Sequence, residues 1–130
     1  MPFVIAMDYD GTLFTNSWPD SSANPNLPVI SKLQEFVEHG AHVVLWTCRE
    51  GEVLDTAVAS CKKAGIHFQA VNENAPCVKK YLAKYSMLHK LAGRKIMASI
   101  YVDDAAPGSI ESFLNMNAKE VCESCEKSFT

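Results

Sequence analysis

The sequence predicts an α/β fold with a central parallel sheet, on two observations. Four short apolar runs lie at residues 3–7, 43–46, 68–71 and 100–102, and they are continuous rather than alternating except for the weaker third run, which contains Gln69. Continuous apolar runs are typical of strands that are buried on both faces of a parallel sheet. Stretches with helical spacing separate these runs, and strand–helix alternation predicts parallel strands joined by right-handed crossovers.

Apolar residues at helical spacing indicate the helices in chain order. The first helix is marked by Leu27, Ile30, Leu33 and Val37, with Pro28 in its first turn and Gly40 after its end. The second stripe, closed by Gly65, comprises Val53, Leu54, Ala57, Val58 and Cys61. A third helix is expected around Val78, Tyr81, Leu82 and Tyr85, and Ser109 is expected to cap a fourth that carries Ile110, Phe113 and Leu114.

Length and composition indicate one globular domain over residues 1–130, with 48% hydrophobic and 21% charged residues. The net charge of −3 argues against a general nucleic-acid-binding surface. No apolar run is long enough to cross a bilayer, and the acidic N-terminus does not resemble a secretory signal, so we expect a cytoplasmic protein without membrane partners.

The five cysteines do not indicate a disulfide framework, because their number is odd and no export signal precedes them. Cys122 and Cys125 form a C-x-x-C pair, but no second pair is present to complete a zinc site. We therefore expect structural or incidental roles for these cysteines.

Each predicted strand ends in a polar residue, namely Asp8, Thr47, Asn72 and Asp103. In open α/β sheets, ligands bind beyond the carboxyl ends of the strands. These four side chains, distant in sequence, are therefore expected to converge in one crevice.

Paired carboxylates indicate a cation site at this edge. Asp8 and Asp10 lie two apart on an extended chain and face the same way, and Gly11 permits a tight turn after them. Asp103 and Asp104 add two more acids. An Asp-Gly pair alone would also fit an ordinary turn, but the second acidic pair favours a metal site, and hard oxygen ligands favour Mg²⁺.

Three segments, in this order along the chain, carry a resemblance to a known family: DYDGTL at 8–13, LWTCRE at 45–50 and YVDDAAPG at 101–108. They resemble the first, second and fourth motifs of the haloacid dehalogenase-like (HAD) superfamily. The chain looks most like a group of small, uncharacterised bacterial and phage members. The resemblance implies a three-layer Rossmann-like fold, and the short spacings between motifs leave no room for a cap domain.

The resemblance implies a Mg²⁺-dependent phosphatase. Asp8 would attack phosphorus and form an aspartyl-phosphate, and Asp10 would act as general acid and base. Thr47 would hydrogen-bond a phosphate oxygen. Asp103 and Asp104 would hold the metal with Asp8 and the Asp10 carbonyl. Dehalogenase members lack the second aspartate, so the resemblance is to a phosphatase rather than a dehalogenase. The substrate that we expect is a nucleotide or a sugar phosphate.

The basic residue of the third motif has three candidates. Lys95 is the first choice, and Lys79 and Lys80 compete with it. An extended chain would place Lys95 about 26 Å from Asp103, so Lys95 can serve only if the chain bends before residue 100. Further substrate contacts are expected from Gly11, Thr12, Thr47, Cys48, Arg49 and Trp18. Arg49 could also pair with Glu50, and Trp18 could simply anchor the flap at residues 14–25.

An open, capless site suits a small phosphorylated substrate or a larger phosphorylated molecule. Because a second subunit could cover such a site, we also expect a homodimer. Mutase chemistry is a competing hypothesis, but it commonly needs a cap. The other alternative is a non-catalytic metal- or partner-binding module that retains the HAD fold. The presence of both Asp8 and Asp10 favours the enzyme.

Overall fold

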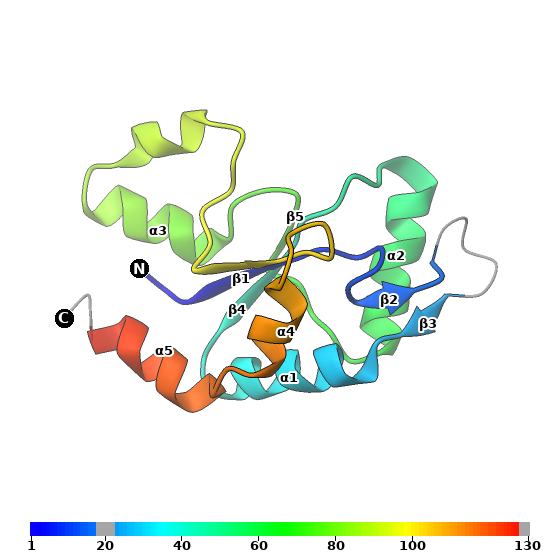
Figure 1. Ribbon diagram of the computed structural model, residues 1–130. Helices are drawn as coiled ribbons and strands as arrows, with labels where there is room; N and C mark the ends of the chain where they lie inside the picture. Colours follow the sequence, from blue (N-terminus) through cyan, green and yellow to red (C-terminus); the bar gives the residue numbers. More distant parts are fainter. Residues whose placement is uncertain (18–22, 128–130) are drawn as a thin grey trace.

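A four-stranded parallel sheet forms the centre of the protein (Figure 1). The structure, a computed structural model, describes residues 1–17 and 23–127. The strand order is β5-β4-β1-β6. The strands are β1 (Val4–Met7), β4 (His42–Leu45), β5 (Ala70–Val71) and β6 (Ile100–Val102). All four apolar runs predicted as strands therefore contribute to one sheet.

The helices are α1 (Leu27–Glu38), α2 (Gly51–Lys63), α3 (Pro76–Lys84), α4 (Ser109–Leu114) and α5 (Ala118–Lys127), with a 3₁₀ turn η1 (Leu88–Ala92). A short antiparallel pair, β2 (Phe14–Thr15) and β3 (Asn24–Pro25), follows β1. The four predicted helices are confirmed within a few residues, whereas α5, η1 and the β2–β3 pair were not predicted. None of the helices in the described part of the chain has the length and apolar character needed to cross a membrane.

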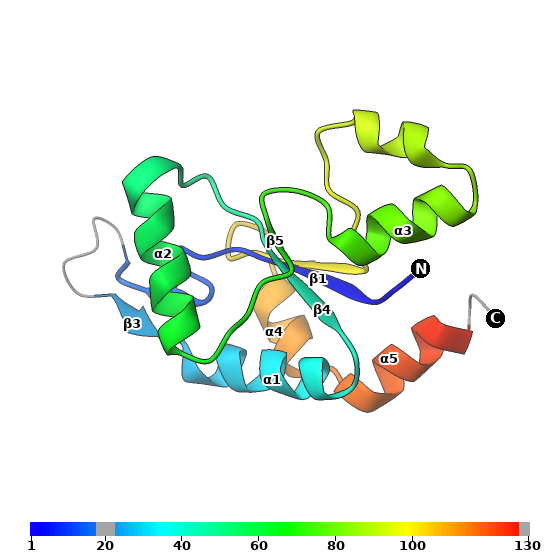
Figure 2. The ribbon, with the colours of Figure 1, turned by 180° about the vertical axis from the view of Figure 1, so that it is seen from behind.

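Side chains of β1 alternate between the two faces of the sheet, and both faces are buried. Ile5 and Met7 pack into the larger core beneath α1 and α4, whereas Val4 and Ala6 pack into a smaller core beneath α3. Figures 1 and 2 show α1, α4 and α5 on one side of the sheet and α3 on the other. Helices cover both faces, so the fold is an α/β fold of the Rossmann-like type.

The larger core is organised around Phe36 of α1. Its ring stacks on Phe3, with ring centroids 5.7 Å apart, and on Phe113 of α4, at 5.3 Å. Phe36 and Phe113 are completely buried. These contacts fix α1 and α4 against the sheet, and α4 directly follows the loop that carries Asp103 and Asp104.

The predicted cap at Ser109 is wrong. Gly108, in the left-handed conformation with φ +79°, precedes α4 as its N-cap residue. The Ser109 hydroxyl instead accepts a hydrogen bond from the Asp103 N–H (3.1 Å) and donates one to the Tyr101 carbonyl (3.1 Å). Ser109 therefore fixes the end of β6, where two of the acids lie.

Candidate functional site

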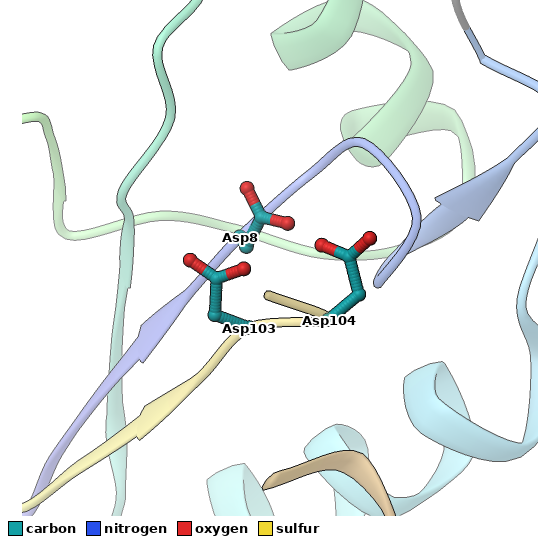
Figure 3. Close-up of side chains that lie close together, drawn as sticks. All are labelled: Asp8, Asp103 and Asp104. Atoms are coloured by element: carbon teal, nitrogen blue, oxygen red, sulfur yellow. The ribbon is translucent and has the colours of Figure 1, made fainter. Parts of the chain in front are cut away.

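The sheet topology brings three carboxylates together (Figure 3). Asp8 follows β1, and Asp103 and Asp104 follow β6. These strands are neighbours in register, with Met7 opposite Val102, and the Asp8 N–H donates to the Val102 carbonyl at 3.0 Å. One carboxylate oxygen from each of the three acids lies within 4.8 Å of the others. The predicted convergence of Asp8 and Asp103 is therefore confirmed, and Asp104 joins them.

Thr12 fixes two of these acids from the turn that follows β1. Its hydroxyl donates to Asp8 Oδ2 (3.0 Å) and accepts a hydrogen bond from the Asp104 N–H (3.0 Å). Thr12 is completely buried. The hydroxyl thus couples the end of β1 to the loop after β6. Its predicted contact with substrate stays a prediction.

Gly11 is required by both backbone geometry and space. Its φ is +81°, and a Cβ at this position would lie 2.3 Å from Asp104 Oδ2 and 2.8 Å from Asp104 Cγ. Residues with a side chain rarely adopt this backbone conformation, and the contact would displace the carboxylate. Gly11 therefore allows Asp104 to approach the turn that carries Asp8 and Asp10.

The surroundings of Asp8 disfavour the negative charge of its ionised carboxylate. The pKa of the Asp8 carboxyl is raised to about 7, chiefly by burial, then by its hydrogen bond with Asp104 and by the negative charge of Asp103. The hydrogen bond from Thr12 opposes this rise. A group of oxygen donors that resists full ionisation is stabilised by a cation, and oxygen-only donor sets suit a hard divalent ion such as Mg²⁺.

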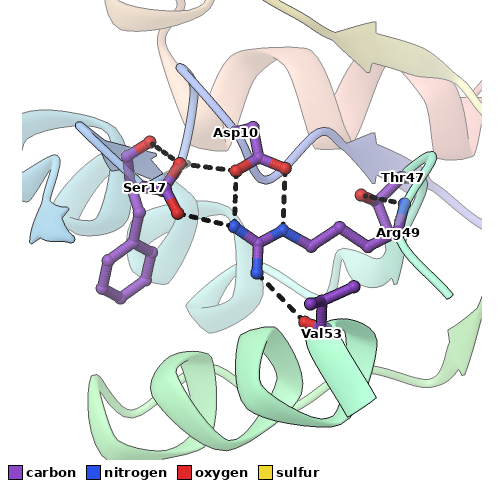
Figure 4. Close-up of polar contacts among 6 residues, drawn as sticks. Asp10, Ser17, Thr47, Arg49 and Val53 are labelled. Atoms are coloured by element: carbon purple, nitrogen blue, oxygen red, sulfur yellow. Dashed lines mark hydrogen bonds and ion pairs between the residues drawn. The ribbon is translucent and has the colours of Figure 1, made fainter. Parts of the chain in front are cut away.

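The Asp10 side chain forms an ion pair with Arg49 (Figure 4), whereas the oxygens that lie within 4.8 Å of one another come from Asp8, Asp103 and Asp104. Arg49 Nε donates to Asp10 Oδ2 at 2.8 Å, and Nη2 donates to Oδ1 at 2.7 Å. The Ser17 hydroxyl adds a hydrogen bond to Oδ1 at 2.6 Å. The hydrogen bonds from Arg49 are the main reason that the pKa of Asp10 lies below its usual range, against the opposing effect of burial.

The protein surrounds the Arg49 guanidinium, whose side chain is 2% exposed. Nη1 donates to the Val53 carbonyl (3.0 Å) and Nη2 donates to the Ser17 carbonyl (2.8 Å). The guanidinium also lies 4.6 Å from the centroid of the Tyr9 ring. Sequence reasoning offered substrate or Glu50 as its partner, whereas the structure gives it Asp10. A direct substrate contact of Arg49 stays a prediction.

The loop after β4 carries Thr47 and Cys48. The Thr47 N–H donates to Asn72 Oδ1 at 2.8 Å, and the Thr47 hydroxyl accepts from the Arg49 N–H at 3.2 Å. Asn72 thus links the ends of β5 and β4. Cys48 is exposed. A cavity of about 530 Å³ lies beside it and is also lined by Asp10, Arg49, Glu50 and Val53.

The lysine expected to complete the site is not identified by a contact. The chain does bend before β6, and Lys95 Nζ lies 5.1 Å from the centroid of the Tyr101 ring. Lys79 forms an ion pair with Glu73 at 3.6 Å. The roles of Lys95, Lys79 and Lys80 at the site stay predictions. Trp18 and the middle of the expected flap lie outside the described residues.

Asn74 links two segments that lie far apart in the sequence. Its side-chain Oδ1 accepts a hydrogen bond from the Met97 N–H at 2.7 Å, and the residue is buried. This bond connects the segment after β5 to the segment before β6. Nothing in the local sequence distinguishes such a long-range contact from a simple turn.

Comparisons with known proteins support the fold. No protein-family model matches the chain, and no curated protein sequence matches it. A conserved protein of Bacteroides thetaiotaomicron has a similar structure, with a TM-score of 0.65 and 26% sequence identity. That match covers 100% of this chain and 94% of the other. The α/β architecture described above is therefore shared over the whole of this chain and most of the other protein.

Two further solved structures are more distant. A hypothetical protein from Xanthomonas campestris matches with a TM-score of 0.46 and 16% identity, over 98% of this chain and 88% of the other. A protein from Vibrio cholerae matches with a TM-score of 0.39 and 24% identity, over 97% and 98%.

Proposed function

We propose that this protein is a HAD-like, Mg²⁺-dependent phosphatase that hydrolyses a phosphomonoester through Asp8. The observation that carries the proposal is the carboxylate cluster at the carboxyl edge of the sheet, where oxygens of Asp8, Asp103 and Asp104 lie within 4.8 Å of one another. The resemblance of the segments around these acids to HAD motifs adds independent support. A nucleotide or a sugar phosphate is the substrate class that we propose, in a cytoplasmic setting.

The donor set fits a divalent cation. Asp8, Asp103 and Asp104 would hold Mg²⁺, together with the Asp10 carbonyl that the resemblance implies. The ion would supply positive charge that neutralises the carboxylates and the phosphoryl oxygens. Its charge would also oppose the effects that raise the pKa of Asp8, leaving the carboxylate ionised as a nucleophile must be.

The first step transfers the phosphoryl group to the protein. An Asp8 carboxylate oxygen forms a bond to phosphorus, and the bond from phosphorus to the leaving oxygen breaks with its electron pair on that oxygen. The Asp10 carboxyl gives its proton to the leaving oxygen, which departs as an alcohol. Thr47 is proposed to hydrogen-bond a phosphoryl oxygen during this step.

The second step releases phosphate and restores both acids. Water attacks phosphorus, Asp10 accepts a proton from that water, and the bond between phosphorus and Asp8 breaks. The hydrogen bonds from Arg49 and Ser17 hold the pKa of Asp10 below its usual range, so they favour the ionised form that accepts this proton and oppose the protonated form that acts in the first step. The proton gained here is the one that Asp10 donates in the next turnover.

The proposal is tested by hydrolysis of 4-nitrophenyl phosphate with Mg²⁺ and after chelation with EDTA. We expect turnover by the wild type only with the metal. Asp8→Asn, which is nearly isosteric, should reduce the rate to background while the circular dichroism spectrum is retained. Asp55→Asn is the matched control, because it makes the same substitution at an exposed position of α2.

Either of two results would contradict the proposal. Wild-type-like turnover by Asp8→Asn would remove Asp8 as nucleophile, and turnover that ignores chelation would remove the metal. Absence of hydrolysis across aryl, nucleoside and sugar phosphates would favour a binding module that retains this fold.

A further inference from the structure

We propose that Arg49 is a positioning residue, which acts on the reaction by holding the Asp10 carboxylate in place for proton transfer. The inference rests on the proposed function, because it gives Asp10 the role of proton donor. It assigns Arg49 no contact with the phosphoryl group. Three observations support this role: the geometry of the Arg49–Asp10 ion pair, the burial of the guanidinium, and the hydrogen bonds that its N–H groups already make within the protein.

The pair has a geometry that fixes the orientation of the Asp10 carboxylate. Two parallel N–H···O bonds, of 2.8 and 2.7 Å, join one edge of the guanidinium to both carboxylate oxygens. A bidentate pair restrains rotation as well as position, which a single hydrogen bond does not. The Ser17 hydroxyl contacts one of the same oxygens at 2.6 Å. The Asp10 carboxylate is thus held at three points.

The protein in turn holds the Arg49 guanidinium rigidly. Nη1 and Nη2 donate to the carbonyls of Val53, in the first turn of α2, and Ser17, in the loop after β2. The Tyr9 ring lies beside the guanidinium, 4.6 Å from Cζ to the ring centroid. Arg49 thereby connects the first turn of α2 to the Asp10 carboxylate, which lies on the turn after β1.

The same contacts argue against a direct role in binding phosphate. A guanidinium has five N–H donors, and the four hydrogen bonds described above engage its Nε, Nη1 and Nη2 atoms. The side chain is 2% exposed, whereas the Asp10 side chain is 34% exposed. Both residues line the adjoining cavity of about 530 Å³, but the more exposed side chain of the pair is that of Asp10. A phosphoryl oxygen could reach Arg49 only by displacing contacts within the protein.

The test uses two aryl phosphates that differ in their need for a proton. Phenyl phosphate has a poor leaving group that requires protonation, and 2,4-dinitrophenyl phosphate has one that does not. The kcat/KM value reports steps up to the first irreversible one, which here is phosphoryl transfer to Asp8. Misplacing a catalytic group by about 1 Å can cost about 100-fold in rate.

We expect Arg49→Gln to lower kcat/KM for phenyl phosphate by about 100-fold and for 2,4-dinitrophenyl phosphate by less than about fivefold. Arg49→Lys should rescue little, because an ammonium cannot form the bidentate pair. Inhibition by inorganic phosphate should be unchanged. Lys62→Gln, at an exposed position near the end of α2, removes the same charge and should match the wild type for both substrates.

A double-mutant cycle shows whether Arg49 acts through Asp10. In an Asp10→Asn background, Arg49→Gln should cause no further loss with phenyl phosphate. Ser17→Ala provides a second test if Arg49→Gln does not fold, since it removes one hydrogen bond from Asp10 without changing charge. Ser17→Ala should lower kcat/KM for phenyl phosphate by about tenfold and have less effect on 2,4-dinitrophenyl phosphate, because only one hydrogen bond to Asp10 is lost.

Equal losses for the two substrates, or weaker inhibition by inorganic phosphate in Arg49→Gln, would overturn the inference and make Arg49 a phosphate-binding residue. Additive losses in the double mutant would also overturn it. In each of these cases the wild type still turns over, so the proposed function survives. A wild type that hydrolyses neither ester would instead refute the proposed function, and the role of Arg49 with it.

Discussion

Magnesium should stabilise the protein more strongly at pH 8 than at pH 5.5, because protons and the cation compete for Asp8. Without metal, the pKa of Asp8 in the folded protein is about 7, well above the value of about 3.9 for a free aspartate. The folded state therefore binds more protons than the unfolded state between these values. The stability that Asp8 contributes is complete below about pH 4 and is lost as the pH rises towards 7.

The size of the effect follows from this pKa. At pH 5.5 an Asp8 with a pKa of about 7 is roughly 97% protonated, which would weaken cation binding by about 30-fold. Asp8 is only half-buried, so solvent screens its charge and we expect the weakening of cation binding to be about tenfold. Magnesium at 100 times its Kd stabilises by about 2.7 kcal/mol, and at 10 times by about 1.4 kcal/mol. For 130 residues, each kcal/mol corresponds to about 3–5 °C in Tm.

The assay is thermal unfolding followed by circular dichroism, with Mg²⁺ at 100 times the Kd measured at pH 8. We expect the Mg²⁺-induced rise in Tm to be about 8–13 °C at pH 8 and about 4–7 °C at pH 5.5. Asp103→Asn should reduce both rises, because it removes one of the three carboxylates. Asp55→Asn, on the exposed face of α2, should retain both. Equal rises at the two pH values, or no rise at pH 8, would refute the linkage between Asp8 and the cation.

Three further predictions concern the support of the site and the core. Gly11→Ala should weaken Mg²⁺ binding at least tenfold in calorimetric titration. The added Cβ would lie 2.3 Å from Asp104 Oδ2, which is too close, so the Asp104 carboxylate would have to move. Unchanged affinity would show that Asp104 does not bind the ion. Thr12→Val should lower the free energy of unfolding by about 1–3 kcal/mol in urea denaturation, because the Asp104 N–H loses its acceptor and Asp8 its donor. Phe36→Ala should cost about 3–5 kcal/mol in the same measurement, since a completely buried ring that stacks on two others is replaced by a cavity. A cost below 1 kcal/mol would contradict the described packing.

Local patterns in the sequence were sufficient to predict the sheet and the convergence of its polar ends. The apolar runs are continuous because β1 is buried on both faces, and parallel strands bring their carboxyl ends to one edge. Asp8 and Asp103 meet for this reason, and Thr12 and Gly11 allow Asp104 to join them. The short β2–β3 pair was missed because two-residue strands have no periodicity to detect.

The contacts between side chains on different segments could not be predicted. Arg49 is followed directly by Glu50, and nothing local indicates that its partner is Asp10, 39 residues earlier. The same holds for Ser109, whose hydroxyl follows a helix-capping pattern but bonds the backbone of β6 and the loop after it. Such contacts depend on how loops approach in three dimensions, so the sequence restricts the possible partners without selecting one.

The most direct test of the central claim is to trap the phosphorylated protein. Wild-type protein with Mg²⁺ and 2,4-dinitrophenyl phosphate would be quenched in acid within one turnover, digested and analysed by mass spectrometry. We predict a phosphoryl group on Asp8 that is stable to acid and removed by hydroxylamine, as expected of an acyl phosphate, and no such group in Asp8→Asn. Turnover without phosphorylation of Asp8, or a phosphoryl group on another residue, would contradict the role of Asp8 as the nucleophile.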